Sequence, residues 1–445
     1  FASYYSDHMV LQKEPAGAMV WGYGEPGAMV TVALAKDSGT IIMKKTAQVK
    51  GLSGMWTTVL DPMDHGGPYA LTAGQGSENV TLRDVYFGDV WLCSGQSNMA
   101  MTVLQITNAS QELAAAARYP YVRLFTAAPA RSDMELEDLE RVDLPWSIPT
   151  AEKLGHGNFT YFSALCWLLG RYLYEVLRYP VGLVEAAWGG PPIEAWSSRR
   201  ALRACGLPED AGSPQFRGWP CVLHPPLSPA LFSSISQHWQ LSGPQTPSVL
   251  WNAMIHPLLN MTLRGVVWYQ GEANAFLHTD QYNCTFPALI ADWRWAFHVG
   301  SAGQTEPLLP FGFVQLSTYR RQSPDDSFAR LRWHQTADLG IVPNARMPGT
   351  FMAVAMDLGD ERSPYGRRVL GSEHRGLKLI HPRDKQNVAH RLHLGARAVA
   401  YAEKNLVFQG PYPTRAILEV TRGLLNVTYS QELICRRRDA WAFEV

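Results

Sequence analysis

The sequence predicts an α/β fold in which a mostly parallel sheet, covered by helices on both faces, follows a small β-sandwich domain and precedes a β-rich segment. Three observations support this prediction. Residues 1–85 contain short β-branched or aromatic runs separated by Gly- and Pro-containing turns. Residues 86–405 alternate strand-like runs with amphipathic stretches, which is typical of right-handed βαβ units. Residues 406–445 return to strand-like runs and form either a small β appendage or part of a domain that continues.

The individual elements follow from these patterns. In the first domain, turns such as Gly-Glu-Pro-Gly and His-Gly-Gly-Pro separate expected strands at 18–23, 29–34, 40–43 and 55–60. In the second, the expected strands cover 89–92, 121–125, 181–187, 265–269, 311–316 and 351–356, and the clearest helices cover 162–177 and 383–404. The last segment has expected strands at 414–421, 424–429 and 440–445. Because parallel α/β sheets bind ligands beyond the carboxyl ends of their strands, we expect the functional site at that edge.

Composition excludes several classes of function. A chain of 445 residues is too long for one ordinary core, and two or three domains are expected. Lys plus Arg number 39 and Asp plus Glu also number 39, so the formal charge of zero argues against nucleic-acid partners and anionic membranes. No apolar run is long enough to cross a bilayer, and Phe1 begins no recognisable signal peptide.

Glycosylation acceptors and cysteines indicate the cellular compartment. Six sites match the N-x-[ST] pattern, where chance predicts about one or two, and this excess favours the secretory pathway, with a lysosomal or secreted location. They are Asn79, Asn108, Asn158, Asn260, Asn283 and Asn426. The six cysteines lack a CxxC motif and fit a few disulfides in an oxidising compartment. Cys93 and Cys166 lie in apolar runs and could equally be buried thiols.

A serine just past a buried strand is the first candidate for catalysis. In Gly88-Asp-Val-Trp-Leu-Cys-Ser-Gly-Gln-Ser97-Asn-Met, the apolar run ends in small and polar residues. Rigid backbone would hold the Ser97 hydroxyl toward a cleft, as nucleophilic catalysis requires. A simple polar turn also explains any single Gly-x-Ser, so the remaining strand ends must supply partners.

Two later strand ends and one histidine supply such partners. Gly189 follows the strand at 181–187, and paired glycines free backbone N–H groups for an oxyanion hole. Gln270 and Glu272 follow the strand at 265–269 and offer an amide donor and an acid. His381 precedes the last long helix, where a proline fixes its entry, and is the expected base. We expect no metal site, because the i, i+3 pair His390 and His393 lacks a third ligand.

Four motifs, in the same order, resemble those of the sialate O-acetylesterase family of the SGNH (GDSL-like) esterase superfamily. They are the Gly-Asp-Val-Trp-Leu-Cys-Ser-Gly-Gln-Ser-Asn-Met stretch, Trp-Gly-Gly-Pro-Pro-Ile-Glu-Ala-Trp, Val-Val-Trp-Tyr-Gln-Gly-Glu-Ala-Asn and Ile-His-Pro-Arg-Asp-Lys-Gln. The resemblance extends over nearly the whole chain and points to a vertebrate lysosomal or secreted member. It implies a three-layer α/β/α fold, no metal or other cofactor, and removal of O-acetyl groups from sialic acids, chiefly at the 9-position, through an acetyl-serine intermediate.

The same resemblance implies residue roles. Ser97 becomes the nucleophile and His381 the general base. The backbone N–H groups of Ser97 and Gly189 would bind the oxyanion, with the side chain of Gln270 as third donor. An acetylesterase for other acetylated carbohydrates, or a catalytically impaired carbohydrate-binding homologue, would carry the same core motifs and is kept as an alternative.

Two departures from the family pattern bear on activity. The superfamily carries Asp three residues before its histidine, where this chain has Lys378. We therefore expect the acid that orients His381 to be Glu272 first. The alternatives are then Asp357 or Asp360, which follow the last strand of the sheet, and finally Asp384. Stretches 216–243 and 367–379 look like insertions, and the second would displace His381.

Overall fold

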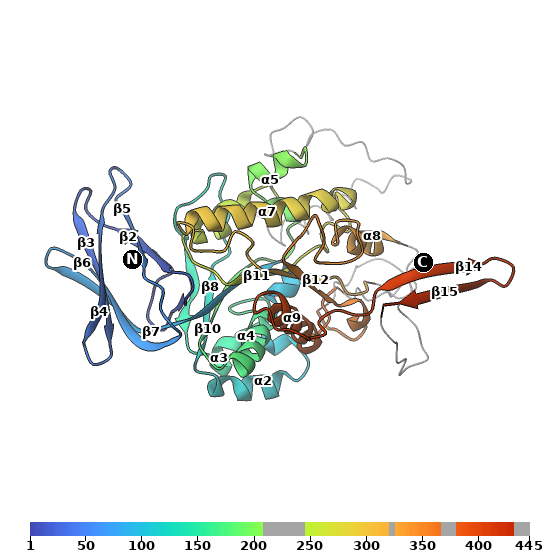
Figure 1. Cartoon of the computed structure of the whole chain (residues 1–445), viewed down its shortest axis with the longest axis horizontal. Coiled ribbons are helices and arrows are strands. Elements are labelled where there is room, and N and C mark those ends of the chain that lie inside the picture. The colour runs from blue at the N-terminus through green and yellow to red at the C-terminus, as the bar shows by residue number, and fades with distance from the viewer. Residues whose placement is uncertain (208–244, 320–324, 366–379, 431–445) are drawn as a thin grey trace.

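One long strand joins the two parts of the fold. In the computed structural model, which describes residues 1–207, 245–319, 325–365 and 380–430, strand β7 (Glu78–Gly95) has 18 residues (Figure 1). Its first half pairs antiparallel with β6 (Gly66–Gln75), and its second half pairs parallel with two strands of the α/β part. The expected boundary between residues 85 and 86 therefore falls inside a continuous strand.

The N-terminal part is built from strands and turns. Its other strands are β1 (Val10–Gln12), β2 (Ala18–Tyr23), β3 (Met29–Lys36), β4 (Ile41–Gln48) and β5 (Met55–Leu60). Strand β3 pairs antiparallel with β4 and β6, β2 pairs with β5 in a second sheet, and β1 runs parallel to β7. Trp21 and Trp56 are fully buried in this part. The four strands expected here correspond to β2, β3, β4 and β5, whereas β1 and β6 were not expected.

The central sheet has the order β13-β12-β11-β7-β10-β8-β9. Its further strands are β8 (Val122–Ala127), β9 (Val142–Ser147), β10 (Val181–Ala187), β11 (Gly265–Tyr269), β12 (Phe311–Gln315) and β13 (Thr350–Val354). All pairs along this order are parallel except β8 with the edge strand β9. The sheet is thus mixed and mostly parallel, and β10 and β11 coincide with the expected strands.

Helices cover both faces of this sheet. Figure 1 shows α5 (Arg199–Ala204) and α7 (Tyr282–Gly300) on one side and α2 (Ala109–Ala115), α3 (Ala151–Leu154), α4 (Ala164–Leu177) and α9 (Lys385–Val399) on the other. The other α-helices within the described residues are α1 (Ser97–Ala100) and α8 (Ser327–His334). Short 3₁₀ turns cover Val103–Gln105, Ala116–Arg118, Ile193–Trp196, His256–Leu258, Thr279–Gln281 and Met356–Leu358, and a π turn covers Trp251–Ile255.

Two disulfides fasten helices to their neighbours. Cys93 of β7 is bonded to Cys166 of α4, so these residues are not free thiols. Cys205, just after α5, is bonded to Cys284 of α7. The disulfides fit an oxidising compartment. The other two cysteines lie outside the described residues.

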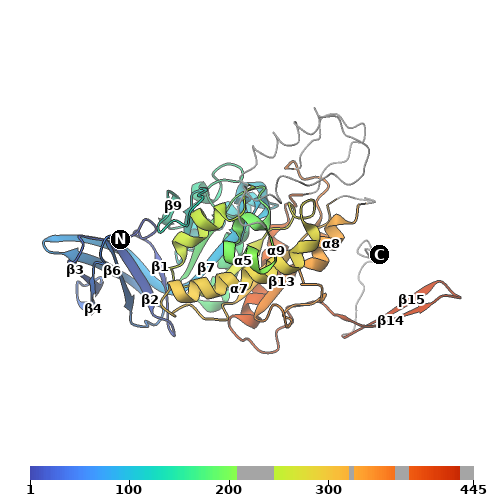
Figure 2. The same ribbon diagram turned by 90° about the horizontal axis from the view of Figure 1, so that it is seen from above.

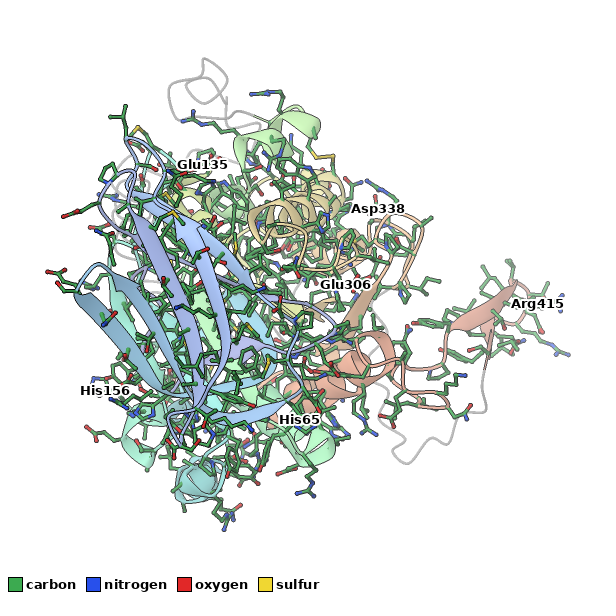
Figure 3. All side chains as sticks on the ribbon, turned by 60° about the vertical axis from the view of Figure 1, so that its left-hand side comes forward. His65, Glu135, His156, Glu306, Asp338 and Arg415 are labelled. Atoms are coloured by element: carbon green, nitrogen blue, oxygen red, sulfur yellow. A yellow bond between two sulfur atoms is a disulfide. The ribbon has the colours of Figure 1, made fainter. Side chains whose placement is uncertain are left out.

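The C-terminal strands form a separate projection. Strands β14 (Pro413–Glu419) and β15 (Leu424–Tyr429) pair antiparallel in a two-stranded sheet that extends away from the rest (Figure 2). Figure 3 shows Arg415 on this projection, apart from the other labelled side chains. The strand expected at 440–445 lies outside the described residues. Within the described ranges, the helices are too short or too polar to cross a bilayer.

Candidate active site

The carboxyl ends of three neighbouring strands form the site. In the sheet, β7 lies between β10 and β11, and all three run parallel. Gly95, Ala187 and Tyr269 are partners in this register, so the residues that follow them lie at one edge. This edge holds Ser97, Gly189, Gln270 and Glu272, in agreement with the location expected for a parallel α/β sheet.

A tight turn after Gly95 presents Ser97 at the start of α1. Gly95 has φ of +141°, and a Cβ there would lie 2.1 Å from the carbonyl O of Tyr269. Only glycine fits this position, because a side chain would push β7 and β11 apart. The N–H of Gln96 then donates to the same carbonyl O (2.9 Å), which fixes the turn.

Ser97 and His381, which are 284 residues apart in the sequence, are in hydrogen-bond contact. Oγ of Ser97 lies 2.7 Å from Nε2 of His381. Nδ1 of His381 lies 2.6 Å from the carbonyl O of Tyr365, which can only accept. Nδ1 therefore carries the ring proton, and the Nε2 lone pair is left to accept from the Ser97 hydroxyl. This is the tautomer that a general base needs.

An aromatic residue that was not among the expected site residues, Phe159, packs on the histidine. The ring centroids of Phe159 and His381 lie 5.1 Å apart. Phe159 has φ of +55°, a conformation that is rare for a bulky residue, and its N–H donates to Oε1 of Gln105 (2.8 Å). Strained backbone of this kind is concentrated at functional sites.

Glu272 is brought to Asn98 rather than to His381. Nδ2 of Asn98 donates to Oε1 of Glu272, and the carboxyl group is 3% exposed. Burial raises the pKa of Glu272, although the Asn98 hydrogen bond and the charge of Lys385 oppose this. Its Oε2 has no hydrogen-bond partner within the described part of the chain. The expected direct contact of Glu272 with the histidine is thus replaced by a contact with the residue that follows Ser97.

The alternative acids are also engaged elsewhere. Asp357 forms a bidentate ion pair with Arg391 (2.6 and 2.8 Å). Asp360 does the same with Arg383 (2.6 and 3.1 Å). Asp384 is the N-cap of α9, where its Oδ1 accepts from the N–H of Asn387 (3.1 Å). Among the contacts of the described residues, Nδ1 of His381 lies 2.6 Å from the carbonyl O of Tyr365.

Two backbone N–H groups at this edge, those of Ser97 and Gly189, are candidates for binding an oxyanion. A Cβ at Gly189 would lie 3.4 Å from Cβ of Ser97, so these residues are neighbours. Ser97 is the first residue of α1, and neither its N–H nor that of Gly189 has an acceptor within the ranges that the structure describes. An oxyanion hole requires such donors next to the attacking oxygen, which here would be the hydroxyl of Ser97.

Gln270, expected as the third donor, instead supports a loop. Its Nε2 donates to Oδ1 of Asn274 (2.7 Å), and its Oε1 accepts from the hydroxyl of Tyr282 (3.0 Å). The side chain is fully buried. Oδ1 of Asn274 also accepts from the N–H of Ile193 (2.8 Å), so Gln270 stabilises the loop that carries Gly189.

The glycosylation acceptors differ in exposure. Asn79, Asn108, Asn158 and Asn426 are exposed, whereas Asn260 and Asn283 are half-buried. The amide of Asn283 already donates to Asp338. Both expected insertions, 216–243 and 367–379, lie outside the described residues.

A cation centre has no support in the described ranges. They contain no group of three or more His, Cys, Asp or Glu side chains placed to hold a metal ion. His393 is packed against Tyr172 and lies beside Arg397, and burial lowers its pKa to about 4.

Comparisons with known proteins identify relatives of this chain. No family model matches the chain. It is 57% identical over 461 residues to the sialate O-acetylesterase of Rattus norvegicus, covering 100% of this chain and 81% of the relative. The identity to the human sialate O-acetylesterase is 56% over 450 residues, covering 100% and 79%. A crystal structure of a carbohydrate acetylesterase from Xanthomonas citri is similar, with a TM-score of 0.70, 29% identity and coverage of 93% of this chain and 78% of that one.

Proposed function

Because this chain belongs to the sialate O-acetylesterase family, we propose that it is a carboxylic-ester hydrolase that removes O-acetyl groups from sialic acids. The observation that carries the mechanism is the hydrogen bond of 2.7 Å between Oγ of Ser97 and Nε2 of His381. A serine activated by a histidine attacks esters by nucleophilic catalysis, which needs no metal ion.

The first half-reaction transfers the acetyl group to the enzyme. Nε2 of His381 takes the proton of Ser97 while Oγ attacks the acetyl carbonyl carbon. The oxyanion that forms accepts hydrogen bonds from the N–H groups of Ser97 and Gly189. When the tetrahedral intermediate collapses, the sugar oxygen leaves with the proton from Nε2 of His381, and acetyl-serine remains.

The second half-reaction releases acetate. Nε2 of His381 takes a proton from water, the resulting hydroxide attacks the acetyl-serine, and the same two N–H groups bind the second oxyanion. Oγ of Ser97 then recovers its proton from His381. In each half-reaction, the carbonyl of Tyr365 accepts from Nδ1–H and favours the imidazolium that forms.

Replacing the nucleophile tests this proposal, and the chain offers a matched control. Ser97→Ala should abolish hydrolysis of an aryl acetate and labelling by a fluorophosphonate probe. Ser94→Ala removes a serine three residues earlier whose Oγ donates to the carbonyl O of Ala186 (2.6 Å). This control should keep activity and cost only about 1 kcal/mol of stability. Full turnover by Ser97→Ala would exclude the proposed mechanism.

Substrate profiling tests the finer proposals. We expect 9-O-acetylated sialosides to be hydrolysed faster than acetylated xylan, whereas the reverse order would favour the alternative of a general carbohydrate acetylesterase. Labelling of Ser97 also separates the enzyme from a carbohydrate-binding homologue that has lost catalysis. The two disulfides and the exposed sequons support a location in the secretory pathway, lysosomal or secreted.

A further inference from the structure

Two buried side chains hold the backbone on either side of His381. Nδ2 of Asn98 donates to the carbonyl O of Ile380 (2.6 Å), and Nζ of Lys385 donates to the carbonyl O of Pro382 (2.8 Å). We propose that Lys385, acting with Asn98, is the positioning residue of the catalytic base and keeps Nε2 of His381 within reach of Ser97. This inference rests on the proposed roles of Ser97 and His381.

Lys385 is buried, and its amino group has polar partners. Its side chain is fully buried, and its Nζ donates to Oδ1 of Asn98 (2.8 Å) as well as to Pro382. The ammonium also lies over the face of Tyr269, 5.0 Å from the ring centroid. Burying an amine is costly unless each donor is satisfied, and here an amide oxygen, a carbonyl oxygen and a ring face satisfy it.

The hydrogen bonds of the Asn98 amide to Lys385 and Glu272 define its orientation. Its carbonyl oxygen faces the ammonium of Lys385, and its NH₂ group faces the carboxylate of Glu272. The flipped amide would set donor against donor and acceptor against acceptor. In this orientation of the amide, the second N–H of Nδ2 of Asn98 donates to the carbonyl O of Ile380.

The arrangement accounts for the absence of an acid three residues before the histidine. An acid at that place would orient the imidazole directly, but this chain has Lys378 there. Here the carbonyl of Tyr365 sets the tautomer of His381, while Asn98 and Lys385 fix the backbone that carries the ring. Glu272 contributes through Asn98.

Kinetic measurements of a Lys385 variant, in the native protein and in the His381→Ala variant, test the role of Lys385. Lys385→Met keeps an unbranched side chain one atom shorter and removes the hydrogen bonds of Nζ. We expect kcat on an aryl acetate to fall about 30- to 100-fold, because small displacements of a reacting group cost that much, with KM changed less than about twofold. In the His381→Ala background the same substitution should change the residual kcat less than about threefold, because Lys385 acts through His381. The matched control is Lys404→Met, at an exposed position beyond α9, which should leave both constants unchanged.

The outcomes separate this inference from the proposed function. An equal loss of kcat in both backgrounds would indicate a general structural role and overturn the inference, as would an unchanged kcat in the native background. If circular dichroism shows that Lys385→Met does not fold, Asn98→Ala is measured in the same two backgrounds and judged in the same way. Full activity of His381→Ala alone would instead overturn the role of His381, and this inference with it.

Discussion

Gly95→Ala should destabilise the protein and displace Ser97, because the turn at the end of β7 has no room for a side chain. The new Cβ would lie 2.1 Å from the carbonyl O and 2.7 Å from the carbonyl C of Tyr269. The backbone conformation, with φ of +141°, costs about 1–3 kcal/mol for any residue other than glycine. Overpacking of the sheet adds about 1–3 kcal/mol, so the expected loss of stability is about 2–6 kcal/mol.

Guanidinium unfolding followed by tryptophan fluorescence measures this loss, and hydrolysis of an aryl acetate reports the position of Ser97. The matched control is Gly189→Ala, whose Cβ would find its nearest neighbour at 3.4 Å, at Cβ of Ser97. We expect this control to keep its stability within about 1 kcal/mol and to lose activity, because the methyl group narrows the space beside the nucleophile. If Gly95→Ala unfolded at the same denaturant concentration as the native protein and kept its kcat, the argument from close strand contact would be refuted.

Two further substitutions test the buried acid Glu185 and the alternative orienting acid Asp357. Burial raises the pKa of Glu185 to about 8, although the N–H of Ser163 donates to Oε2 (2.6 Å). The contribution of Glu185 to the free energy of unfolding should be full below about pH 4.5 and be lost as pH rises through 8. The native protein should therefore lose stability relative to Glu185→Gln across this range. Parallel curves of stability against pH for the two proteins would contradict the raised pKa of Glu185. Asp357→Asn should change kcat less than about threefold, because this carboxylate pairs with Arg391 on α9, and a loss of a hundredfold or more would restore Asp357 as the orienting acid.

Local sequence was sufficient for two strands that are made mainly of apolar residues and are buried along their whole length. The runs at 181–187 and 265–269 are bounded by turn residues, and the structure places β10 and β11 over the same residues. Strand β6 was not expected because it begins with Gly-Gly-Pro, which is typical of turns. Such a start is tolerated because the strand's later residues pair with β3 and β7.

The length of β7 depended on contacts that local sequence does not contain. The expected strand covered only 89–92, and the domain boundary was placed between residues 85 and 86, where the pattern changes to alternating strands and helices. In the structure, Asp89 accepts hydrogen bonds from Gln12 (2.8 Å), Tyr179 (2.7 Å) and Tyr401 (2.8 Å). These partners come from three distant parts of the chain, and they allow the carboxylate to be buried within a continuous strand.

For the site, the sequence by itself determined which residue types stand at the strand ends. Parallel strands end at one edge, so Ser97, Gly189 and Glu272 could be expected together, and the proline after His381 indicated a fixed entry to α9. The direction of each side chain was decided only by the tertiary structure. Gln270 and Glu272 follow the same strand, yet Gln270 contacts Asn274 in the loop after β11, whereas Glu272 contacts Asn98 in α1.

The contacts of Asn98 and Lys385 with the backbone around His381 likewise combine residues that the sequence shows with an arrangement that only the fold provides. Asn98 directly follows Ser97, and Lys385 lies four residues after His381, so both stood inside recognised motifs. Their function depends on two carbonyl groups and on one amide orientation that exist only when α1 and the start of α9 are packed together. A buried polar group must find a partner wherever the fold provides one. The sequence therefore singled out Ser97 and His381, the proposed nucleophile and base, whereas the groups that hold His381 in place were decided by tertiary packing.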